Sequence, residues 1–301
     1  MMHLPSPPLV SADWLSGHLG DVRVIDIRGK VLPAGTVGPR YFAKRDDYNR
    51  SHIPGALFVD WTTDIVDPND PIASQIAPPA KFESLMTALA IGTADKTPFV
   101  AYDDYNTIFA SRFVWALRYY GHDTARVLDG GWARWVRDGR PTEDHPPSPP
   151  RPVGPFTARA RPLLRRTADE VAARLGHDDL LLIDARPPAQ FAGNVSAAAR
   201  AGHIPGARNV PYTSLIDQTT GELLALPELR KSFAKSGVDV DALPREIVCY
   251  CNGGITATVP LTALHAFGRS DVAVYDGSWN EWGNDPNRPI ERGERGETEN
   301  T

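Results

Sequence analysis

The sequence predicts an α/β fold built from two similar domains, and two observations indicate it. First, the chain repeats itself once: VIDIRG at 24–29 returns as LIDARP at 182–187, SHIPGALFV as GHIPGARNV, and RVLDGGWARW as AVYDGSWNEW, in the same order. Second, each copy alternates short β-branched runs with segments of helical spacing, which is typical of a mainly parallel, buried sheet flanked by helices. An internal duplication of one α/β domain accounts for both observations.

A proline-rich stretch separates the two copies. The segment HPPSPPRPVGP runs from His145 to Pro155, and its prolines favour an extended path. We therefore expect an N-terminal domain over residues 1–145, a linker over 146–155 and a C-terminal domain over 156–301. A chain of 301 residues that is 42% hydrophobic is long enough for two such cores.

Compact apolar runs predict the strands of each copy. They are RVIDI, PFVAY and RVLDG in the first copy, and LLLIDAR, IVCYC and VAVYD in the second. Helical spacing occurs in TADEVAARLG, in LPELRKSFAKSG and over 257–267, where Pro260 is tolerated near the first turn. The two copies therefore place their strands in matching order.

Composition excludes several classes of function. The formal net charge is −5, without a basic stripe or polybasic patch, which argues against a nucleic acid or a membrane surface as partner. The start, MMHLPSPPLVSADW, has no import signal, and no segment is apolar for long enough to span a bilayer. We expect a cytoplasmic protein that keeps its two cysteines as thiols. The oligomeric state stays open, and a monomer is compatible with the sequence.

One loop near the end of the chain carries the reactive candidate. The apolar run Ile247–Tyr250 is followed by CNGGIT, from Cys251 to Thr256, and then by a helical stretch. A glycine-bearing loop between a strand and a helix directs backbone N–H groups into one concavity, where the positive end of the helix dipole adds to them. Such a loop stabilises an anion, so we expect Cys251 to be a nucleophile that exists as a thiolate or a persulfide.

The repeat decides between a structural and a catalytic cysteine. A cysteine after a strand is more often structural, and Cys249 is expected to pack as a small apolar side chain. A disulfide to Cys251 would be strained, and no metal-ligand cluster surrounds it. Tyr102 corresponds to Tyr250, which places Asp103 opposite Cys251. This difference indicates one working site and one scaffold copy.

These features resemble the tandem-domain rhodanese-like sulfurtransferases over nearly the whole chain. The matching segments, in order, are PLVSADWL, HIPGA, GHDTARVLDGGWARW, DARP with GHIPGARNVP, the CNGGITA loop and YDGSWNEW. The resemblance implies two rhodanese-like domains, of which only the C-terminal one is catalytic. It implies that Cys251 accepts sulfur from a donor as a persulfide and passes it to cyanide, a small thiol or a protein thiol. No metal or organic cofactor is expected.

The same resemblance implies a set of substrate contacts. The loop amides are expected to form the cradle, and the hydroxyls of Thr256 and Ser278 to lie near the outer sulfur. Related phosphatases use a longer loop with an arginine near its end, whereas this loop continues with Ala257 and Thr258, which argues against phosphate esters. The expected substrate-binding residues are Asn252, Gly253, Gly254, Ile255, Thr256, Arg186, Gln190, Arg200 and Ser278.

The donor is expected to be thiosulfate or 3-mercaptopyruvate. Family members that use thiosulfate carry two basic residues after the cysteine, while those that use 3-mercaptopyruvate have a neutral loop, as this chain has. The chain departs from the family at Gly253, where the mercaptopyruvate type has serine, and at Gln190, where both types have arginine. Arg186 and Arg200 remain as candidates for the carboxylate or sulfonate contact.

Residues that occur in both copies are expected to be structural. They include Asp26 and Asp184 at strand ends, His52 and His203 in the HIPGA turns, and the paired tryptophans. Two other functions stay open. Gln190 and Gly253 are compatible with a catalytically silent binding or regulatory module, and a thiol-redox protein would need Cys249 as a resolving cysteine.

Overall fold

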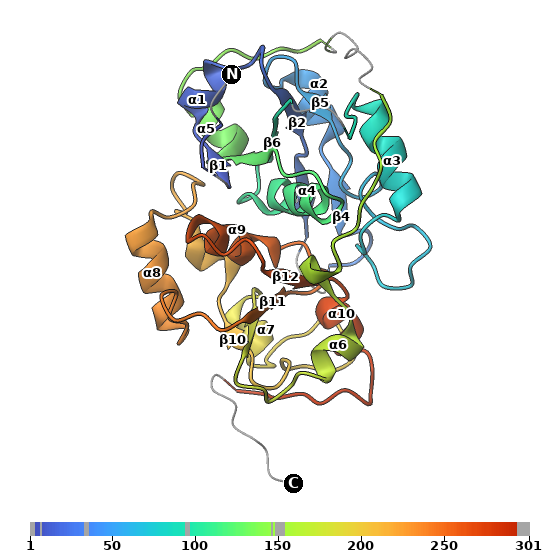
Figure 1. The fold of residues 1–301 in the computed structure, drawn as a ribbon, viewed down its shortest axis with the longest axis vertical. Helices are drawn as coiled ribbons and strands as arrows, with labels where there is room; N and C mark the ends of the chain where they lie inside the picture. The colour runs from blue at the N-terminus through green and yellow to red at the C-terminus, as the bar shows by residue number, and fades with distance from the viewer. Residues whose placement is uncertain are drawn as a thin grey trace. The chain divides into compact units, whose positions relative to one another are not determined.

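The computed structural model describes residues 4–6, 8–32, 36–93, 97–145, 147 and 154–293, and these form two compact units (Figure 1). Unit 1 comprises Met1–Asn69, Ile76–Arg161 and Gln218–Leu223, and unit 2 comprises Asp70–Gln75, Pro162–Asp217 and Leu224–Thr301. Residues 146 and 148–153 of the expected linker lie outside the described part of the chain. Each unit is thus one sequence copy with a short segment of the other copy added.

Unit 1 is built on a five-stranded parallel sheet with the order β1-β7-β6-β2-β5. Its strands are β1 (Leu9–Val10), β2 (Arg23–Asp26), β5 (Leu57–Phe58), β6 (Phe99–Tyr102) and β7 (Ala125–Leu128). A small antiparallel pair is formed by β3 (Gly29–Val31) and β4 (Tyr41–Ala43). The helices are α1 (Ala12–Ser16), α2 (Arg45–Arg50), α3 (Pro79–Ala88), α4 (Ile108–Tyr119) and α5 (Gly131–Arg137).

Unit 2 repeats this plan with the strand order β10-β9-β11-β12-β8, again parallel throughout. Its strands are β8 (Arg165–Arg166), β9 (Leu180–Asp184), β10 (Arg208–Asn209), β11 (Glu246–Tyr250) and β12 (Ala273–Tyr275). The helices are α6 (Ala168–Ala172), α7 (Pro188–Phe191), α8 (Leu226–Lys235), α9 (Thr258–Ala266) and α10 (Ser278–Trp282), with short 3₁₀ turns at Pro162–Leu164 and Tyr212–Leu215. The predicted fold class, with a mainly parallel sheet flanked by helices in each copy, is confirmed.

The central strands form because their runs are apolar on both faces. All four residues of β6 and of β7 are buried, as are four of the five residues of β11. The helices that follow β6 and β11 are buried as well: ten residues of α4 and seven of α9 are buried. Pro260 is the third residue of α9, within the first turn, where no helical N–H partner is lost.

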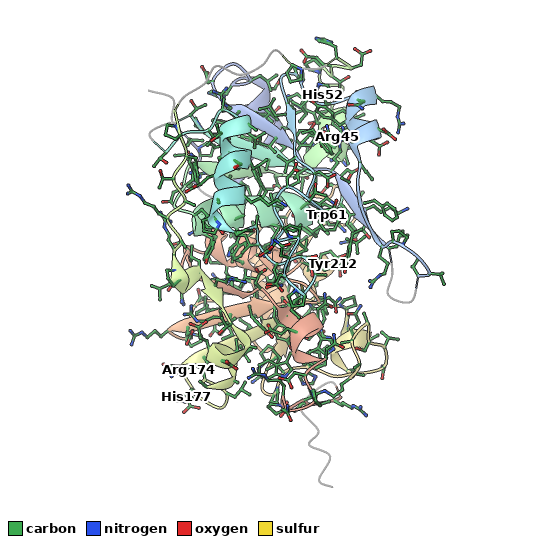
Figure 2. All side chains as sticks on the ribbon, turned by 90° about the vertical axis from the view of Figure 1, so that its right-hand side faces the viewer. Arg45, His52, Trp61, Arg174, His177 and Tyr212 are labelled. Carbon is green, nitrogen blue, oxygen red and sulfur yellow. The ribbon has the colours of Figure 1, made fainter. Side chains whose placement is uncertain are left out.

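Large aromatic side chains fill the cores between sheet and helices. Trp61 of unit 1, labelled in Figure 2, is 1% exposed, and its indole N–H donates to the carbonyl of Phe42 at 3.0 Å. Gly29 is required beside it, because a Cβ at this position would lie 2.1 Å from the indole nitrogen. In unit 2, Trp279 and Trp282 are fully buried. The expectation that these two tryptophans are core anchors is confirmed.

The two HIPGA turns are built in the same way. His52 of unit 1 (Figure 2) is 1% exposed, its Nδ1 donates to the carbonyl of Tyr48 at 2.8 Å, and its ring stacks on that tyrosine. His203 of unit 2 donates from Nδ1 to the carbonyl of Phe191 at 2.8 Å and stacks on its ring. Burial lowers the pKa of His203, which favours the neutral ring. Both histidines are packing residues, as the duplication predicts.

Candidate active site

The site lies where two neighbouring parallel strands of unit 2 end. Tyr250, the last residue of β11, pairs with Asp184, the last residue of β9, and Cys251 follows directly. The hydroxyl of Tyr250 accepts a hydrogen bond from the Ile204 amide at 3.1 Å, which ties the GHIPGA turn to the strand end. Parallel strands that end together bring the loops that follow them to one edge of the sheet, which is where ligands bind in α/β proteins.

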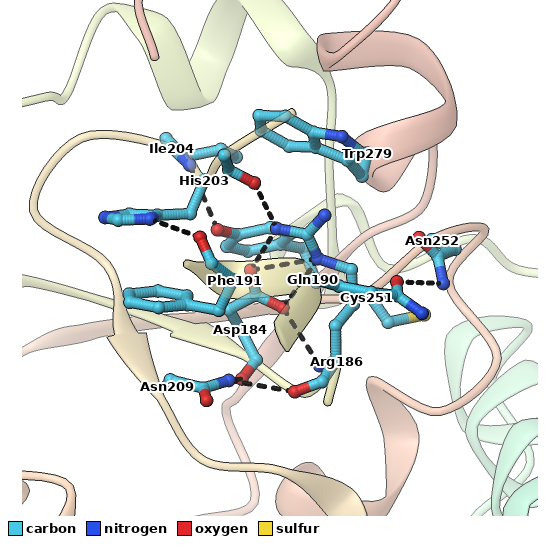
Figure 3. A network of polar contacts seen from close by, with 12 residues as sticks. Asp184, Arg186, Gln190, Phe191, His203, Ile204, Asn209, Cys251, Asn252 and Trp279 are labelled. Carbon is cyan, nitrogen blue, oxygen red and sulfur yellow. Dashed lines mark hydrogen bonds and ion pairs between the residues drawn. The ribbon is translucent and has the colours of Figure 1, made fainter. Parts of the chain in front are cut away.

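A buried ion pair supports this edge (Figure 3). The carboxylate of Asp184 accepts hydrogen bonds from the Arg186 amide at 2.9 Å and from its guanidinium Nη2 at 2.6 Å, and both side chains are at most 1% exposed. Arg186 also donates to the Gly202 carbonyl at 2.8 Å, and its guanidinium lies 4.4 Å from the centroid of a Trp279 ring. Asp184 thus pairs the charge of Arg186, whereas its Nη1 has no hydrogen-bond partner among the described residues, so the expected role of Arg186 as a substrate contact stays a prediction.

Arg186 nevertheless lies within electrostatic reach of the cysteine. Burial lowers the pKa of its guanidinium, but the attraction of Asp184 outweighs this effect, and Tyr250 and Cys251 add to the same upward shift. A positive charge held behind the loop favours a negative sulfur in front of it. The side chain acts through its charge from within the scaffold.

Arg200 is also occupied elsewhere. Its guanidinium donates to the carbonyls of Trp282 at 3.0 Å and Arg288 at 2.8 Å, and it contacts those of Asp285 and Pro286. All four carbonyls belong to the end of α10 and the segment after it. Arg200 therefore fastens this segment, and the expectation that it anchors a carboxylate or sulfonate is not met by its contacts.

Gln190 does reach the cysteine loop. It lies on α7, and its Oε1 accepts a hydrogen bond at 2.9 Å from Nδ2 of Asn252, the residue after Cys251 (Figure 3). The pair places two neutral amide side chains where the family carries a positive charge. Of the three expected substrate contacts upstream of the loop, Gln190 alone forms a hydrogen bond with a loop residue among the described contacts.

Ser278 holds the loop from the other side. Its Oγ accepts hydrogen bonds from the amides of Cys251 and Gly254, each at 3.1 Å, and donates to the Tyr275 carbonyl at 2.7 Å. Its hydroxyl proton is thereby directed to a carbonyl, in contrast to the expectation that it points to the outer sulfur. Ser278 is fully buried and has a left-handed φ of +53°, a rare conformation for a residue with a side chain. It acts as a clamp on the main chain of the loop.

The amides of the loop are only partly used. Within the described part of the chain, the N–H groups of Gly253, Ile255 and Ala257 have no acceptor. Cys251, which begins this loop, is 2% exposed. Thr256 follows in the turn that leads into α9, and among the described residues its hydroxyl makes no hydrogen bond with Cys251. Unpaired N–H groups at the entry of a helix form a site for an anion.

Two glycines shape the loop. Gly254 has a φ of +76°, which side chains disfavour. A Cβ on Gly253 would lie 3.1 Å from Nδ2 of Asn280 and 3.3 Å from the carbonyl oxygen of Ala73. The serine that the mercaptopyruvate type carries here would therefore require these neighbours to move by a few tenths of an ångström.

Cys249 is a different kind of thiol. It is fully buried in the middle of the sheet, between β9 and β12, and desolvation raises its pKa, with a smaller contribution from Cys251. A thiol in this state stays protonated and is a poor nucleophile. Both cysteines are free, so the expected apolar packing of Cys249 is confirmed.

The corresponding loop of unit 1 is filled by its own side chain. The carboxylate of Asp103 accepts hydrogen bonds from four main-chain amides, those of Tyr105 at 2.8 Å, Thr107 at 3.1 Å, Phe109 at 2.9 Å and Ala110 at 2.8 Å. Burial raises the pKa of Asp103 to about 6, although these amides act in the opposite direction, so the group is mainly ionised at pH 7. This loop is an anion cradle with a permanent occupant.

Sequence reasoning missed the contribution of Asp70–Gln75 to unit 2. Gln75 is 4% exposed, and its Nε2 donates to the Asp276 carbonyl at 3.0 Å although the two residues are 201 positions apart. The corresponding residue of the second copy is Leu223, so neither a matching residue in the repeat nor a motif draws attention to Gln75. The one available signal was the repeat register, which aligns Asp70–Gln75 with Gln218–Leu223 and thus shows that the two exchanged segments correspond.

Two kinds of feature are absent from the described residues. Among them there is no group of three or more histidine, cysteine, aspartate or glutamate side chains that could hold a metal ion. In the same residues, no helix is both long and apolar enough to cross a bilayer.

Comparison with known proteins gives a consistent result. The model of the rhodanese-like domain matches residues 11–138 and 167–285. Thiosulfate sulfurtransferase of Gallus gallus is 32% identical over 277 residues, 91% of this chain and 92% of that protein. The 3-mercaptopyruvate sulfurtransferase of Escherichia coli is 34% identical over 287 residues, 94% of this chain and 97% of that protein. The crystal structure of SseA from Escherichia coli, a 3-mercaptopyruvate sulfotransferase with the rhodanese fold, matches with a TM-score of 0.77 and 33% identity over 90% of this chain and 98% of that chain.

Proposed function

Because this chain belongs to the family of tandem-domain rhodanese-like sulfurtransferases, we propose that it transfers sulfur through a persulfide on Cys251. The nucleophile, the loop amides and the buried Arg186 are contributed by unit 2. No step needs a metal or an organic cofactor.

The reaction is a double displacement. In the first half, the Cys251 thiolate attacks the outer sulfur of the donor. With thiosulfate, the S–S bond of the donor breaks and sulfite leaves. With 3-mercaptopyruvate, the C–S bond breaks and pyruvate leaves as its enolate, which takes up the proton of the donor thiol. In the second half, cyanide or a thiolate attacks the outer sulfur of the Cys251 persulfide. The enzyme S–S bond breaks, and its electron pair restores the thiolate.

The observation that carries this proposal is the carboxylate of Asp103. Its oxygens are two bonds from Cβ, as the outer sulfur of a cysteine persulfide would be at Cys251. In the repeat register, the amides that bind Asp103 through Tyr105, Thr107 and Phe109 correspond to those of Gly253, Ile255 and Ala257, which lack acceptors in the described chain. The silent loop thus supports a negative atom at the same place in the catalytic loop.

The surroundings favour 3-mercaptopyruvate over thiosulfate as the donor. The residues after Cys251 are neutral, Gln190 is neutral, and Arg186 and Arg200 are engaged within the scaffold. A dianion gains less from such a site than from one with free cations. The acceptor is cyanide, a small thiol or a protein thiol. A reducing cytoplasm suits a site that depends on one free thiol.

Mass spectrometry of the intact protein tests the proposal. After incubation with 3-mercaptopyruvate or thiosulfate, the protein should gain the mass of one sulfur atom and lose it on addition of cyanide. Cys251→Ser is the control and should gain nothing. If neither donor adds sulfur to the wild type, the proposal fails and a silent binding module is the better description. Steady-state kinetics with both donors side by side then ranks them.

A further inference from the structure

A segment of the first sequence copy is part of the catalytic unit. Asp70–Gln75 belongs to unit 2, and Gln218–Leu223 of the second copy belongs to unit 1. The register that aligns Tyr102 with Tyr250 also aligns these two segments residue for residue. The exchange is therefore reciprocal, and each segment is added to a unit that carries a strand-end loop.

Gln75 anchors its segment in unit 2 through both ends of its side-chain amide. Nε2 donates to the Asp276 carbonyl at 3.0 Å, and Oε1 accepts from Nη2 of Arg165 at 3.3 Å. Arg165 in turn forms an ion pair with the Asp276 carboxylate, with Nε and Oδ2 3.2 Å apart. A buried amide with both ends bonded fixes the position of its partners.

The anchored carbonyl begins the turn that clamps the cysteine loop. Asp276 is followed by Gly277 and Ser278, whose Oγ accepts the amides of Cys251 and Gly254. Ser278 holds this position in a left-handed conformation, which its neighbours must enforce because a side chain disfavours it. A hydrogen bond to the Asp276 carbonyl restrains the turn two residues before the clamp.

The segment also lies against the loop itself. The position of a Cβ on Gly253 would be 3.3 Å from the carbonyl oxygen of Ala73 and 3.6 Å from the Cβ of Ser74. Ser74 itself has a left-handed φ of +71°. The turn at 73–74 thus covers one side of the loop amide that follows Asn252.

In unit 1 the equivalent segment is held differently. Leu223 stands where unit 2 has Gln75, and it donates its main-chain amide to Oδ1 of Asp129 at 2.8 Å. Glu222 of the same segment forms an ion pair with Arg134. The side-chain amide of Gln75 thus bonds to the main chain of the clamping turn in unit 2, at a position where unit 1 has the apolar side chain of Leu223.

We propose that Gln75 is a positioning residue of the sulfur-transfer site. Through the Asp276 carbonyl it holds Ser278, and through Ser278 it holds the amides around Cys251. The first sequence copy, which has no nucleophile of its own, thereby contributes to the reactivity of the second. This inference rests on the proposed role of Cys251 and assigns a further residue to it.

Two substitutions separate the two bonds of Gln75. Gln75→Met has a similar shape and loses both bonds. Gln75→Glu keeps an acceptor for Arg165 but cannot donate to the Asp276 carbonyl. For both variants we expect the rate of Cys251 alkylation by iodoacetamide at pH 7 to fall about fivefold or more, with a pH profile moved to higher pH. Leu223→Met, at the matching position of unit 1, is the control and should react like the wild type.

The outcomes are decisive in either direction. A purely structural role would lower the melting temperature of the variants but leave the alkylation rate and its pH profile within about twofold of the wild type, which would overturn the proposal. A slow Gln75→Met with a normal Gln75→Glu would overturn it as well, since the bond to Arg165 would then be the important one. Alkylation needs no sulfur donor, so a failure of sulfur loading in the wild type remains a separate result.

Discussion

The loop after β6 and the loop after β11 share one backbone plan and differ in what occupies it. In unit 1, the Asp103 carboxylate takes four main-chain N–H groups for itself. In unit 2, the side chain of Cys251 ends at Sγ and lacks the outer atoms with which Asp103 binds these donors. The Ser278 hydroxyl accepts hydrogen bonds from two other amides, those of Cys251 and Gly254. The comparison teaches that a loop of this kind stores a place for one negative atom. A fixed carboxylate makes the place structural, and we propose that a cysteine leaves it to be occupied in turn by the outer sulfur of a persulfide.

The scaffolds around the two loops are nearly the same. Asp26 and Arg28 form the same buried pair as Asp184 and Arg186, and each guanidinium lies over a tryptophan ring. Features present in both units therefore maintain the fold. We assign the features present in one unit, namely the thiol, the clamping serine and Gln75, to the proposed sulfur transfer.

Of the changes that test this comparison, removing the thiol should have the largest effect on the rate of sulfur transfer. Cys251→Ser is expected to lower sulfur transfer by roughly 1,000-fold or more, because the nucleophile is lost while the cradle remains. The assay is the rate of thiocyanate formation from 3-mercaptopyruvate and cyanide.

Cys249→Ala is the matched control for that substitution. It removes a buried, protonated thiol and should leave turnover within about threefold of the wild type. A large loss of turnover in this variant would support a thiol-redox reaction with Cys249 as the resolving cysteine.

Breaking the duplicated ion pair should have the next largest effect. We expect a similar loss of unfolding free energy in both units. Arg186→Met and Arg28→Met each leave a buried carboxylate without its partner, which costs about 3–5 kcal/mol of unfolding free energy. Urea denaturation measures the loss. If Arg186→Met and Arg28→Met were as stable as the wild type, the duplicated ion pair would not be needed for the fold.

Ser278→Gly makes the clamping turn of unit 2 like that of unit 1, where Gly131 stands. The substitution relieves the left-handed side chain but removes the acceptor for the Cys251 and Gly254 amides, so we expect sulfur loading to slow by about 5- to 10-fold. The rate is measured by stopping the reaction with the donor at set times and determining the mass of the intact protein. Ser214→Ala, at an exposed serine of the same unit, should have no effect; an equal rate for Ser278→Gly would remove the clamp from the mechanism.

The smallest effect concerns the occupant of the silent loop. The pKa of Asp103 is raised from 3.8 to about 6, so between these values the folded state binds a proton that the unfolded state has released. The stability contribution of this group therefore decreases as pH rises through this window. Relative to Asp103→Asn, the wild type should lose about 1 kcal/mol of unfolding free energy between pH 5 and pH 7.

Urea titrations of both proteins at the two pH values measure this difference. Asp129, whose pKa burial also raises to about 6, is present in both proteins and cancels in the comparison. Equal pH slopes for the two proteins would show that the Asp103 carboxylate has no raised pKa in the fold.

The long buried strands were predictable from the sequence, and so was the position of Cys251, the proposed nucleophile, directly after one of them. Runs such as Phe99–Tyr102 and Ile247–Tyr250 are apolar on both faces, and the repeat fixed which residues correspond. The outer strands β5 and β10 were not predicted, because each has two residues and no hydrophobic period is visible at that length.

The arginines and the exchanged segments were beyond sequence reasoning for a different reason. Nearness in sequence does not tell where a long side chain points, and Arg186 turns back to Asp184 while Arg200 reaches the segment after α10. Gln75 meets its partner across most of the chain, and local patterns carry no information about such contacts. The chemistry followed from a local motif, whereas its support depends on tertiary packing.

The exchange of segments also orders events during synthesis. Unit 1 includes Gln218–Leu223, so its last piece leaves the ribosome well after Arg161. At about 5–20 residues per second, the roughly 60 intervening residues take about 3–12 s to be made. Until then the nascent first copy lacks the segment Gln218–Leu223 and exposes to chaperones the surface that this segment covers. We expect the two copies to reach their native state together, late in translation, although each resembles a domain that folds alone.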